Sequence, residues 1–123
     1  MRVEAGLTVE VWLEGDCDAL SAETAVAVFR VIQEALTNIV RHARARHVDI
    51  RLSTGRTALD VAVTDDGIGF AVDEARDRPG ASVGLFGMNE RVALVGGSFQ
   101  IASTPGTGTT VHAVVPIDEE LST

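Results

Sequence analysis

The chain of 123 residues has no lysine, no tyrosine and a single cysteine, Cys17. One cysteine excludes an internal disulfide and suits a reducing compartment such as the cytosol. The glycine-rich segment GTGTT at 106–110 cannot be a P-loop, because that motif ends in Lys-Ser or Lys-Thr. Ten arginines against eighteen acidic residues give a net charge of −8, so no basic surface for nucleic acid is expected.

Long apolar runs are also missing. No segment approaches the roughly 18 apolar residues of a membrane span, and no signal peptide is visible. We therefore expect no direct membrane contact and a cytoplasmic location. The length fits one domain over 1–123, with a core at about 7–116 and frayed ends at 1–6 and 117–123.

Alternation of apolar and polar residues is the clearest pattern present. A period of two marks strands with one buried face, so the pattern predicts a mostly antiparallel sheet covered on one side. The alternating segments are 7–14, 48–53, 59–63, 99–101 and 111–115.

Two helices are expected between the strands. The first runs from about Ser21, a suitable N-cap, to Arg44, and the second runs from near Leu85 to the glycine pair 96–97. The charged segment 71–83, which contains Pro-Gly, is expected to be a mobile loop and a candidate lid. Helical spacing gives the first helix a core stripe of Phe29, Ile32, Leu36, Ile39, Val40 and Ala43.

A polar strip lies on the same helix. Glu34, Asn38 and Arg41 fall within roughly 60° of one another, on the side opposite that stripe. A solvated surface is the ordinary interpretation, but apolar residues flank this strip, which favours a covered site. Carboxylate and amide oxygens suit Mg²⁺, and Arg41 suits phosphate oxygens.

Four segments, in order, resemble the ATP-binding catalytic domain of sensor histidine kinases. That domain belongs to the GHKL group, with gyrase, heat-shock chaperones and mismatch-repair ATPases. The first three segments are similar to the N, G1 and G2 boxes, and the likeness spans about residues 20–116. The segments are QEALTNIVRHA (33–43), DDGIGF (65–70), GLFGMNERV (84–92) and PGTGTTV (105–111).

The resemblance implies a fold and a subclass. The fold is α+β, a two-layer α/β sandwich of the GHKL type, whose mixed, mostly antiparallel sheet is covered on one face by helices. The E-A-L-T-N sequence is similar to that of a subclass with a short lid, whose members usually signal to helix-turn-helix response regulators.

At the adenine end, the resemblance assigns roles by position. Asp65 matches the aspartate that accepts a hydrogen bond from the adenine amino group, and Gly67 and Gly69 would let the loop lie close to the base. Thr109 matches a threonine near the adenine, often acting through water. Asp66 matches a variable position and is expected to be a solvated turn residue.

At the phosphate end, the resemblance makes Asn38 a Mg²⁺ ligand. Glu34 would lie near the metal and act in catalysis, and Arg41 and His42 would lie near the phosphates. Gly84 and Gly87 would open the second helix, whose free N–H groups and dipole would favour an anion. The G2-box residues expected to contact the nucleotide are Gly84, Leu85 and Gly87.

The family transfers the γ-phosphoryl group of ATP to a histidine on a separate dimerisation domain. Strand-like sequence starts by Leu7, so no such domain is expected here, and the chain would be an incomplete enzyme alone. His42, His47 and His112 are expected to be structural or surface residues, with a phosphate contact also open for His42. The expected partners are ATP, the histidine-bearing domain and, indirectly, a response regulator.

Three other functions stay open at this point. The chain could be an anti-sigma-factor-type serine kinase, which is complete at about this length. It could be a gyrase-like ATPase fragment in which Glu34 activates water, although the lysine of such proteins is missing. It could also be a nucleotide-binding module without transfer activity.

Overall fold

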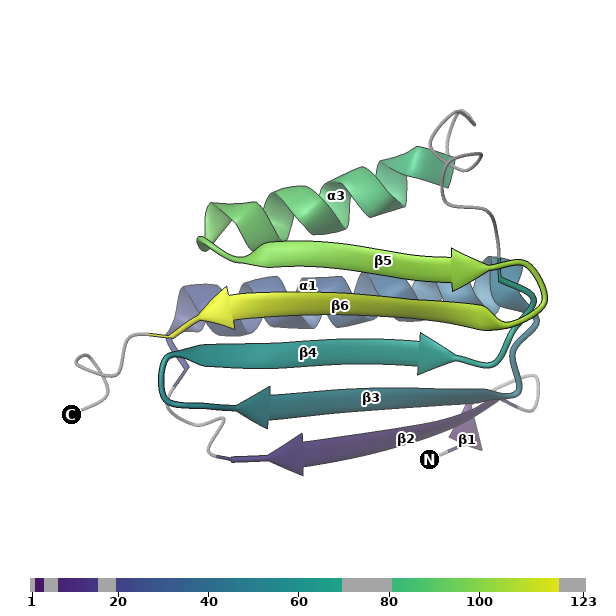
Figure 1. The fold of residues 1–123 in the computed structure, drawn as a ribbon, viewed down its shortest axis with the longest axis horizontal. Coiled ribbons are helices and arrows are strands. Elements are labelled where there is room, and N and C mark those ends of the chain that lie inside the picture. The colour runs from purple at the N-terminus through teal and green to yellow at the C-terminus, as the bar shows by residue number, and fades with distance from the viewer. Residues whose placement is uncertain (1, 4–6, 16–19, 70–80, 118–123) are drawn as a thin grey trace.

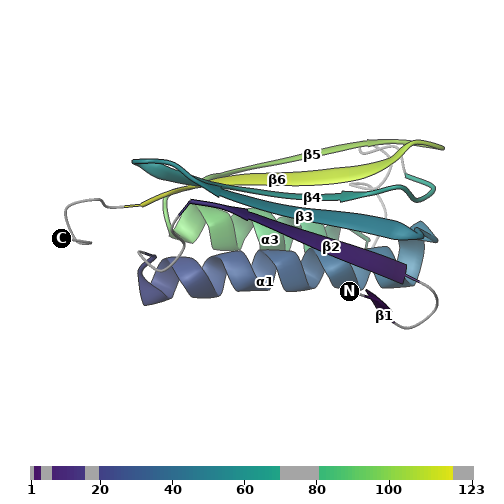
Figure 2. The same cartoon turned by 90° about the horizontal axis from the view of Figure 1, so that it is seen from below.

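The structure, a computed structural model, describes residues 2–3, 7–15, 20–69 and 81–117 and forms two layers. Six strands make one sheet in the order β1-β2-β3-β4-β6-β5, and Figure 2 shows both helices on the same side of it. The strands are β1 (Arg2–Val3), β2 (Leu7–Glu14), β3 (His47–Thr54), β4 (Ala58–Asp65), β5 (Ser98–Thr104) and β6 (Gly108–Pro116). The helices are α1 (Ala22–Asn38), which continues as the π-helical turn η3 (Ile39–Ala43), and α3 (Ala81–Leu94).

Strand pairing confirms the mixed, mostly antiparallel sheet. Only β2 and β3 are parallel, because α1 lies between them in the chain and returns it to the same end of the sheet. The other four pairs are antiparallel. The residues that alternate in the sequence fill the core between sheet and helices: Leu7, Val9, Val48, Ile50, Leu59, Val61, Val63, Val111, Ala113 and Val115.

The alternation of β2 does not lead to burial along its whole length. Leu7 and Val9 are buried, but Val11 and Leu13 on the same face are 54% and 67% exposed. Figure 1 shows why: α1 and α3 lie toward the β5 side of the sheet, and the later part of β2 extends away from them. The alternating pattern identifies which face of a strand can be buried. The position of the helices decides how much of that face is actually buried.

Helix α1 begins as expected, but its buried face differs from the expected one. The Ser21 hydroxyl accepts a hydrogen bond from the Thr24 N–H, which confirms the N-cap. Phe29 and Val40, expected in the core, are 61% and 62% exposed. Ile39 is buried as expected, and Ile32 and Leu36 pack partly buried against the core. The other buried residues of the helix are Thr24, Ala27, Val28, Val31 and Ala35. Apolar residues occur on both sides of this helix, and the alanine-containing side lets its backbone pack closely against α3 and the sheet.

Helix α3 starts earlier than expected and ends where expected. It begins at Ala81, so the expected loop at 71–83 is helical at its end, while 71–80 lie outside the described residues. At the other end, the Gly97 N–H bonds to the Val92 carbonyl and the Gly96 N–H to the Ala93 carbonyl. With Gly96 at φ +78°, these bonds form a Schellman stop.

Both expected frayed ends are partly ordered. Residues 2–3 form the short strand β1 against β2. The Ile117 N–H bonds to the Thr57 carbonyl at 2.9 Å, while 118–123 lie outside the described residues. Among the described residues, no helix is long and apolar enough to cross a membrane.

Candidate functional site

The four motif segments meet at one end of the molecule. Figure 1 shows the C-terminal end of α1, the end of β4, the start of α3 and the β5–β6 turn together at its right-hand side. Hydrogen bonds support this arrangement. The Asp66 carboxylate, just after β4, accepts bonds from the N–H groups of Arg46 and His47, which closely follow η3. The connection from the N-box helix to β3 is therefore bonded directly to the acidic glycine loop.

Asp65, the last residue of β4, is 5% exposed on the helix-covered face. Its Oδ1 accepts a 2.7 Å bond from the Gly67 N–H, and the N–H of Thr109, its partner across the ladder, also bonds to the carboxylate. Burial raises the pKa of Asp65 above its ordinary value of 3.8, although both N–H bonds act to lower it. A carboxylate has about four lone-pair sites, so these bonds leave it able to accept from a ligand amino group.

Gly69 and Gly108 let two backbone segments touch beside Asp65. Both have positive φ, at +65° and +96°. A side chain on Gly69 would lie 2.1 Å from the Thr104 carbonyl oxygen, and one on Gly108 would lie 2.2 Å from that of Asp65. The need for glycine at position 69 therefore comes first from packing against the β5–β6 turn. The expected approach of Gly69 to a base stays a prediction.

Ser103 is a supporting residue that the sequence did not reveal. Its hydroxyl lies 2.7 Å from that of Thr109 and donates to the Gly108 carbonyl at 3.1 Å. Ser103 on β5 therefore fixes the Thr109 hydroxyl, while the Thr109 N–H bonds to the Asp65 carboxylate. A serine in an alternating strand gives no signal for this role, because the cross-strand partner is set by register.

Asp66 is exposed, as expected from the sequence, but it also has a structural role. Its Oδ1 accepts bonds of 2.9 Å from the Arg46 N–H and 3.0 Å from the His47 N–H. The bonds from His47 and Arg46 lower the pKa of Asp66. Aspartate is common in turns after a strand, so the sequence does not predict this role. The role as a clamp is seen only in the structure, where the start of β3 lies beside Asp66.

We expect Asp66→Ala to lower the free energy of unfolding by about 1 kcal/mol, since two amide bonds to a charged acceptor are lost at a solvent-screened position. Because the folded pKa is depressed, the contribution is present above the ordinary pKa and is lost as pH falls through the folded value. Urea unfolding at pH 7 and in acid measures it. An unchanged midpoint at pH 7 contradicts the clamp.

The sequence predicts that Glu34 and Asn38 lie opposite the core side of α1. In the structure they flank the buried stripe instead. Each stands three residues after a buried residue, Val31 and Ala35 respectively, and both are half-buried. Within the described part of the chain, neither side chain makes a hydrogen bond or ion pair. Two such oxygens, one turn apart, are free to bind a ligand or a metal ion.

The end of this helix is irregular. Asn38 precedes the π turn η3, which contains Arg41, and Arg44 ends the turn in the left-handed conformation with φ +52°. Arg41 is exposed, and the His42 side chain lies outside the described part of the chain. Single π turns within helices are frequent at functional sites because they change the direction of side chains locally.

The G2-box glycines lie within α3 and do not open it, which corrects the sequence expectation. The helix starts three residues before Gly84, so the N–H groups that have no partner within the helix belong to its first turn, ahead of Gly84. A side chain on Gly87 would meet nothing within 4 Å. Gly87 therefore leaves open space beside the helix, while the side chain of Leu85 lies outside the described part.

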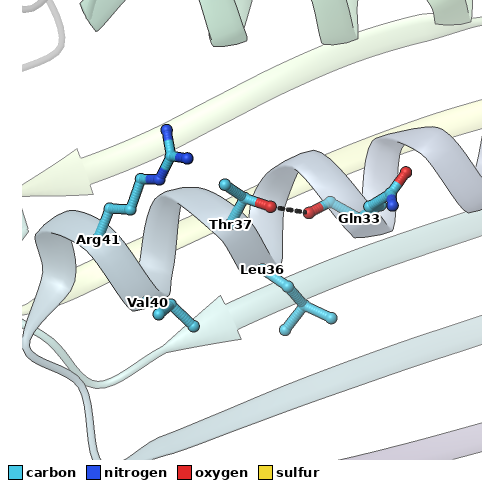
Figure 3. Close-up of a pocket in the computed structure, with 5 residues that line it drawn as sticks. All are labelled: Gln33, Leu36, Thr37, Val40 and Arg41. Carbon is cyan, nitrogen blue, oxygen red and sulfur yellow. Dashed lines mark hydrogen bonds between the residues drawn. The ribbon is translucent and has the colours of Figure 1, made fainter.

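A hollow of about 300 Å³ lies elsewhere, on the outward side of α1. Figure 3 shows the residues that line it: Gln33, Leu36, Thr37, Val40 and Arg41. Only Arg41 belongs to the predicted site, and neither Asn38 nor Asp65 lines the hollow. All five lining residues belong to the N-box segment 33–43, but they line its outward side.

Comparison with protein families matches residues 23–119 to the family described as histidine kinase-, DNA gyrase B-, and HSP90-like ATPase. An uncharacterised sensor-like histidine kinase of Chloroflexus aurantiacus is 43% identical over 96% of the chain, which covers 21% of that relative. The signal transduction histidine-protein kinase/phosphatase DegS of Brevibacillus brevis is 36% identical over 94% of the chain, or 29% of its own length. The chain thus spans less than a third of these relatives.

A solved structure agrees with these matches. The blue-light activated histidine kinase EL346 of Erythrobacter litoralis superposes with a TM-score of 0.78 and 25% identity. The match covers 98% of the chain and 38% of that protein. The similarity therefore includes the whole sandwich, not the motifs alone.

Proposed function

Because the chain belongs to the histidine kinase-, DNA gyrase B- and HSP90-like ATPase family and corresponds to the ATP-binding catalytic domain of sensor histidine kinases, we propose that it binds Mg-ATP and donates the γ-phosphoryl group to a histidine. The acceptor lies on a dimerisation domain outside these 123 residues. The observation that carries the proposal is the buried Asp65 carboxylate, at the same end of the sandwich as the Glu34 and Asn38 oxygens, which have no partner among the described residues.

At the adenine end, Asp65 accepts a hydrogen bond from the exocyclic amino group. Its two backbone donors fix the carboxylate, so little rotational freedom is lost when the base binds. Thr109, held by Ser103, lies beside it and offers a hydroxyl to the base or to a bridging water. Gly67 is buried in the same loop and brings the backbone close to the ring.

At the phosphate end, Asn38 would hold Mg²⁺ through its amide oxygen, and the Glu34 carboxylate would lie near the metal and its waters. Hard oxygen ligands of this kind suit the ion, which takes few protein ligands and keeps water and phosphate oxygens. When bound, Mg²⁺ neutralises charge on the phosphate oxygens. Arg41 and His42 contact the phosphates, and the first turns of α3, with Gly84, Leu85 and Gly87, border them.

In the transfer step, a ring nitrogen of the acceptor histidine attacks the γ-phosphorus. The bond from that phosphorus to the bridging oxygen of ADP breaks, and ADP leaves. Glu34 accepts the proton released from the imidazole. General-base assistance of this kind contributes roughly 10²- to 10⁴-fold.

The phosphohistidine would then supply a response regulator, of the helix-turn-helix type that the E-A-L-T-N sequence suggests. The domain works in the cytoplasm, where ATP is available, and contacts neither membrane nor nucleic acid. A net charge of −8 supports the absence of nucleic-acid binding, because a negatively charged protein repels the phosphate backbone.

The test mixes the chain with γ-labelled ATP, Mg²⁺ and the histidine-bearing domain of the full-length kinase. Label on the acceptor that survives alkali and is lost in acid identifies phosphohistidine. Glu34→Gln is expected to keep ATP affinity, measured by calorimetry, and to lose most of the transfer. Failure of the parent to bind ATP overturns the proposal entirely.

Other products identify the competing functions. Acid-stable label on a protein substrate indicates a serine kinase, and free phosphate without labelled protein indicates an ATPase. Bound ATP that is never consumed indicates a nucleotide-binding module. Each result contradicts the transfer step while leaving the adenine assignment intact.

A further inference from the structure

The open face of the sheet, on the side away from the helices, carries a cluster of three side chains from two neighbouring strands. Glu10 on β2 stands directly across the parallel ladder from Asp49 on β3. His47 precedes Asp49 by two residues, so its side chain projects from the same face. The His47 Nε2 lies 3.0 Å from an Asp49 oxygen and 3.6 Å from a Glu10 oxygen.

These three donor atoms are spaced as metal ligands are. All lie within 4.8 Å of one another. An ion with bonds of about 2.0–2.2 Å to nitrogen and oxygen separates tetrahedral ligands by about 3.4 Å. The distances from the His47 nitrogen, 3.0 and 3.6 Å, bracket that value, so only small side-chain movements are needed to enclose an ion.

The donor set also selects the class of ion. The imidazole distinguishes this cluster from an ordinary group of surface carboxylates, because imidazole suits zinc, nickel and copper but not magnesium or calcium. One nitrogen and two carboxylate oxygens leave at least one coordination position for water or another ligand. This makes the cluster chemically different from the all-oxygen pair, Glu34 and Asn38, on α1.

The backbone beneath the cluster is held firmly. β2 and β3 are paired from Thr8–His47 to Glu14–Ser53. The Thr8 N–H bonds to the Arg46 carbonyl at 2.9 Å, and the Asp66 carboxylate holds the N–H of His47. Ligands on paired strands with fixed register are positioned in advance, so less conformational entropy is lost on binding.

We propose that Glu10, His47 and Asp49 form a binding site for a divalent transition-metal ion, zinc foremost, on the open face of the sheet. This site is distinct from the nucleotide site and does not depend on the proposed function. A built-in comparison lies on the same face: the His112 Nε2 is 3.0 Å from an Asp60 oxygen, across β6 and β4. Among the described residues, that pair has no third metal-ligating side chain close enough to complete a site.

The experiment titrates the chain with Zn²⁺ in the absence of nucleotide, using calorimetry and competition with a chromogenic chelator. Cys17→Ser serves as the background, since the only thiol would otherwise bind zinc. One equivalent of Zn²⁺ is expected to bind. His47→Gln, Asp49→Asn and Glu10→Gln should each weaken binding by at least about tenfold. Co²⁺ should give the visible absorption of an ion with inner-sphere protein ligands.

The matched control is His112→Gln, which removes the other histidine–carboxylate pair and should leave Zn²⁺ affinity unchanged. Excess Mg²⁺ should not displace the zinc, because imidazole is a poor ligand for it. Thermal unfolding without metal checks that each variant folds. Equal affinity in the parent and His47→Gln, or an equal loss in His112→Gln, overturns the site.

Discussion

Replacing Asp65 by asparagine is expected to weaken ATP binding by roughly 10- to 100-fold while the fold stays as stable as the parent or becomes more stable. A hydrogen bond to a charged acceptor contributes about 1.5–3 kcal/mol, which corresponds to this change in affinity. Asparagine can still accept from the Gly67 N–H through its oxygen. It lacks the second carboxylate oxygen and directs an amide donor toward the adenine amino group instead.

The stability part follows from the direction of the pKa shift. Burial raises the pKa of Asp65 in the folded state above 3.8, so ionisation is less favourable in the folded than in the unfolded chain. Its contribution to stability is fully present below the unfolded pKa and is lost as pH rises through the folded pKa. At neutral pH the buried charge therefore lowers the free energy of unfolding, and Asp65→Asn removes that penalty.

Calorimetry with ATP and urea unfolding between pH 3 and 7 measure both effects. The advantage of Asp65→Asn over the parent should be absent in acid and should grow as pH rises. Asp66→Asn is the matched control, because it changes the adjacent carboxylate without touching the adenine position. Unaltered ATP affinity in Asp65→Asn would refute the adenine assignment.

Asn38→Ala is expected to abolish the dependence of ATP binding on Mg²⁺. In the parent, adding Mg²⁺ should strengthen binding about tenfold or more, and in the variant the affinity should match the value in EDTA. Phosphoryl transfer should fall by at least about 100-fold, since positioning and charge neutralisation are the protein's main contribution to this chemistry. Paired titrations with and without Mg²⁺ provide the measurement.

Gln33→Ala is the matched control for this variant. Gln33 carries an amide on the same helix, but it faces outward and accepts a 3.2 Å bond from Arg30. Its removal should leave both Mg²⁺ dependence and transfer unchanged. Equal Mg²⁺ dependence in the parent and Asn38→Ala would place the metal elsewhere.

Local signals in the sequence predicted the elements well where one residue determines the structure. Ser21 was expected as an N-cap and accepts the Thr24 N–H. The glycine pair 96–97 ends α3, because only glycine readily adopts the φ of +78° seen at Gly96. The start of α3 at Ala81 was missed, since the charged segment before it gives no capping signal.

The sequence did not predict which side of α1 is buried, because apolar residues occur on both sides of that helix. Phe29 and Val40 have the size expected of core residues, yet α1 buries the side that carries Ala27 and Ala35. Spacing alone could not decide, because both sides are apolar. The choice depends on how closely α3 and the sheet approach α1, and that distance is a property of the packed structure.

By itself, the sequence determined the order of the two helices and of every strand except β1, the sheet's buried face and the four motifs, because period, caps and glycines act within a few residues of the chain. Only the tertiary structure decided which neighbours those residues have: the Asp66 clamp on β3, the support of Thr109 by Ser103, and the grouping of Glu10 with His47 and Asp49. Each of these depends on strand register, which brings together residues far apart in sequence.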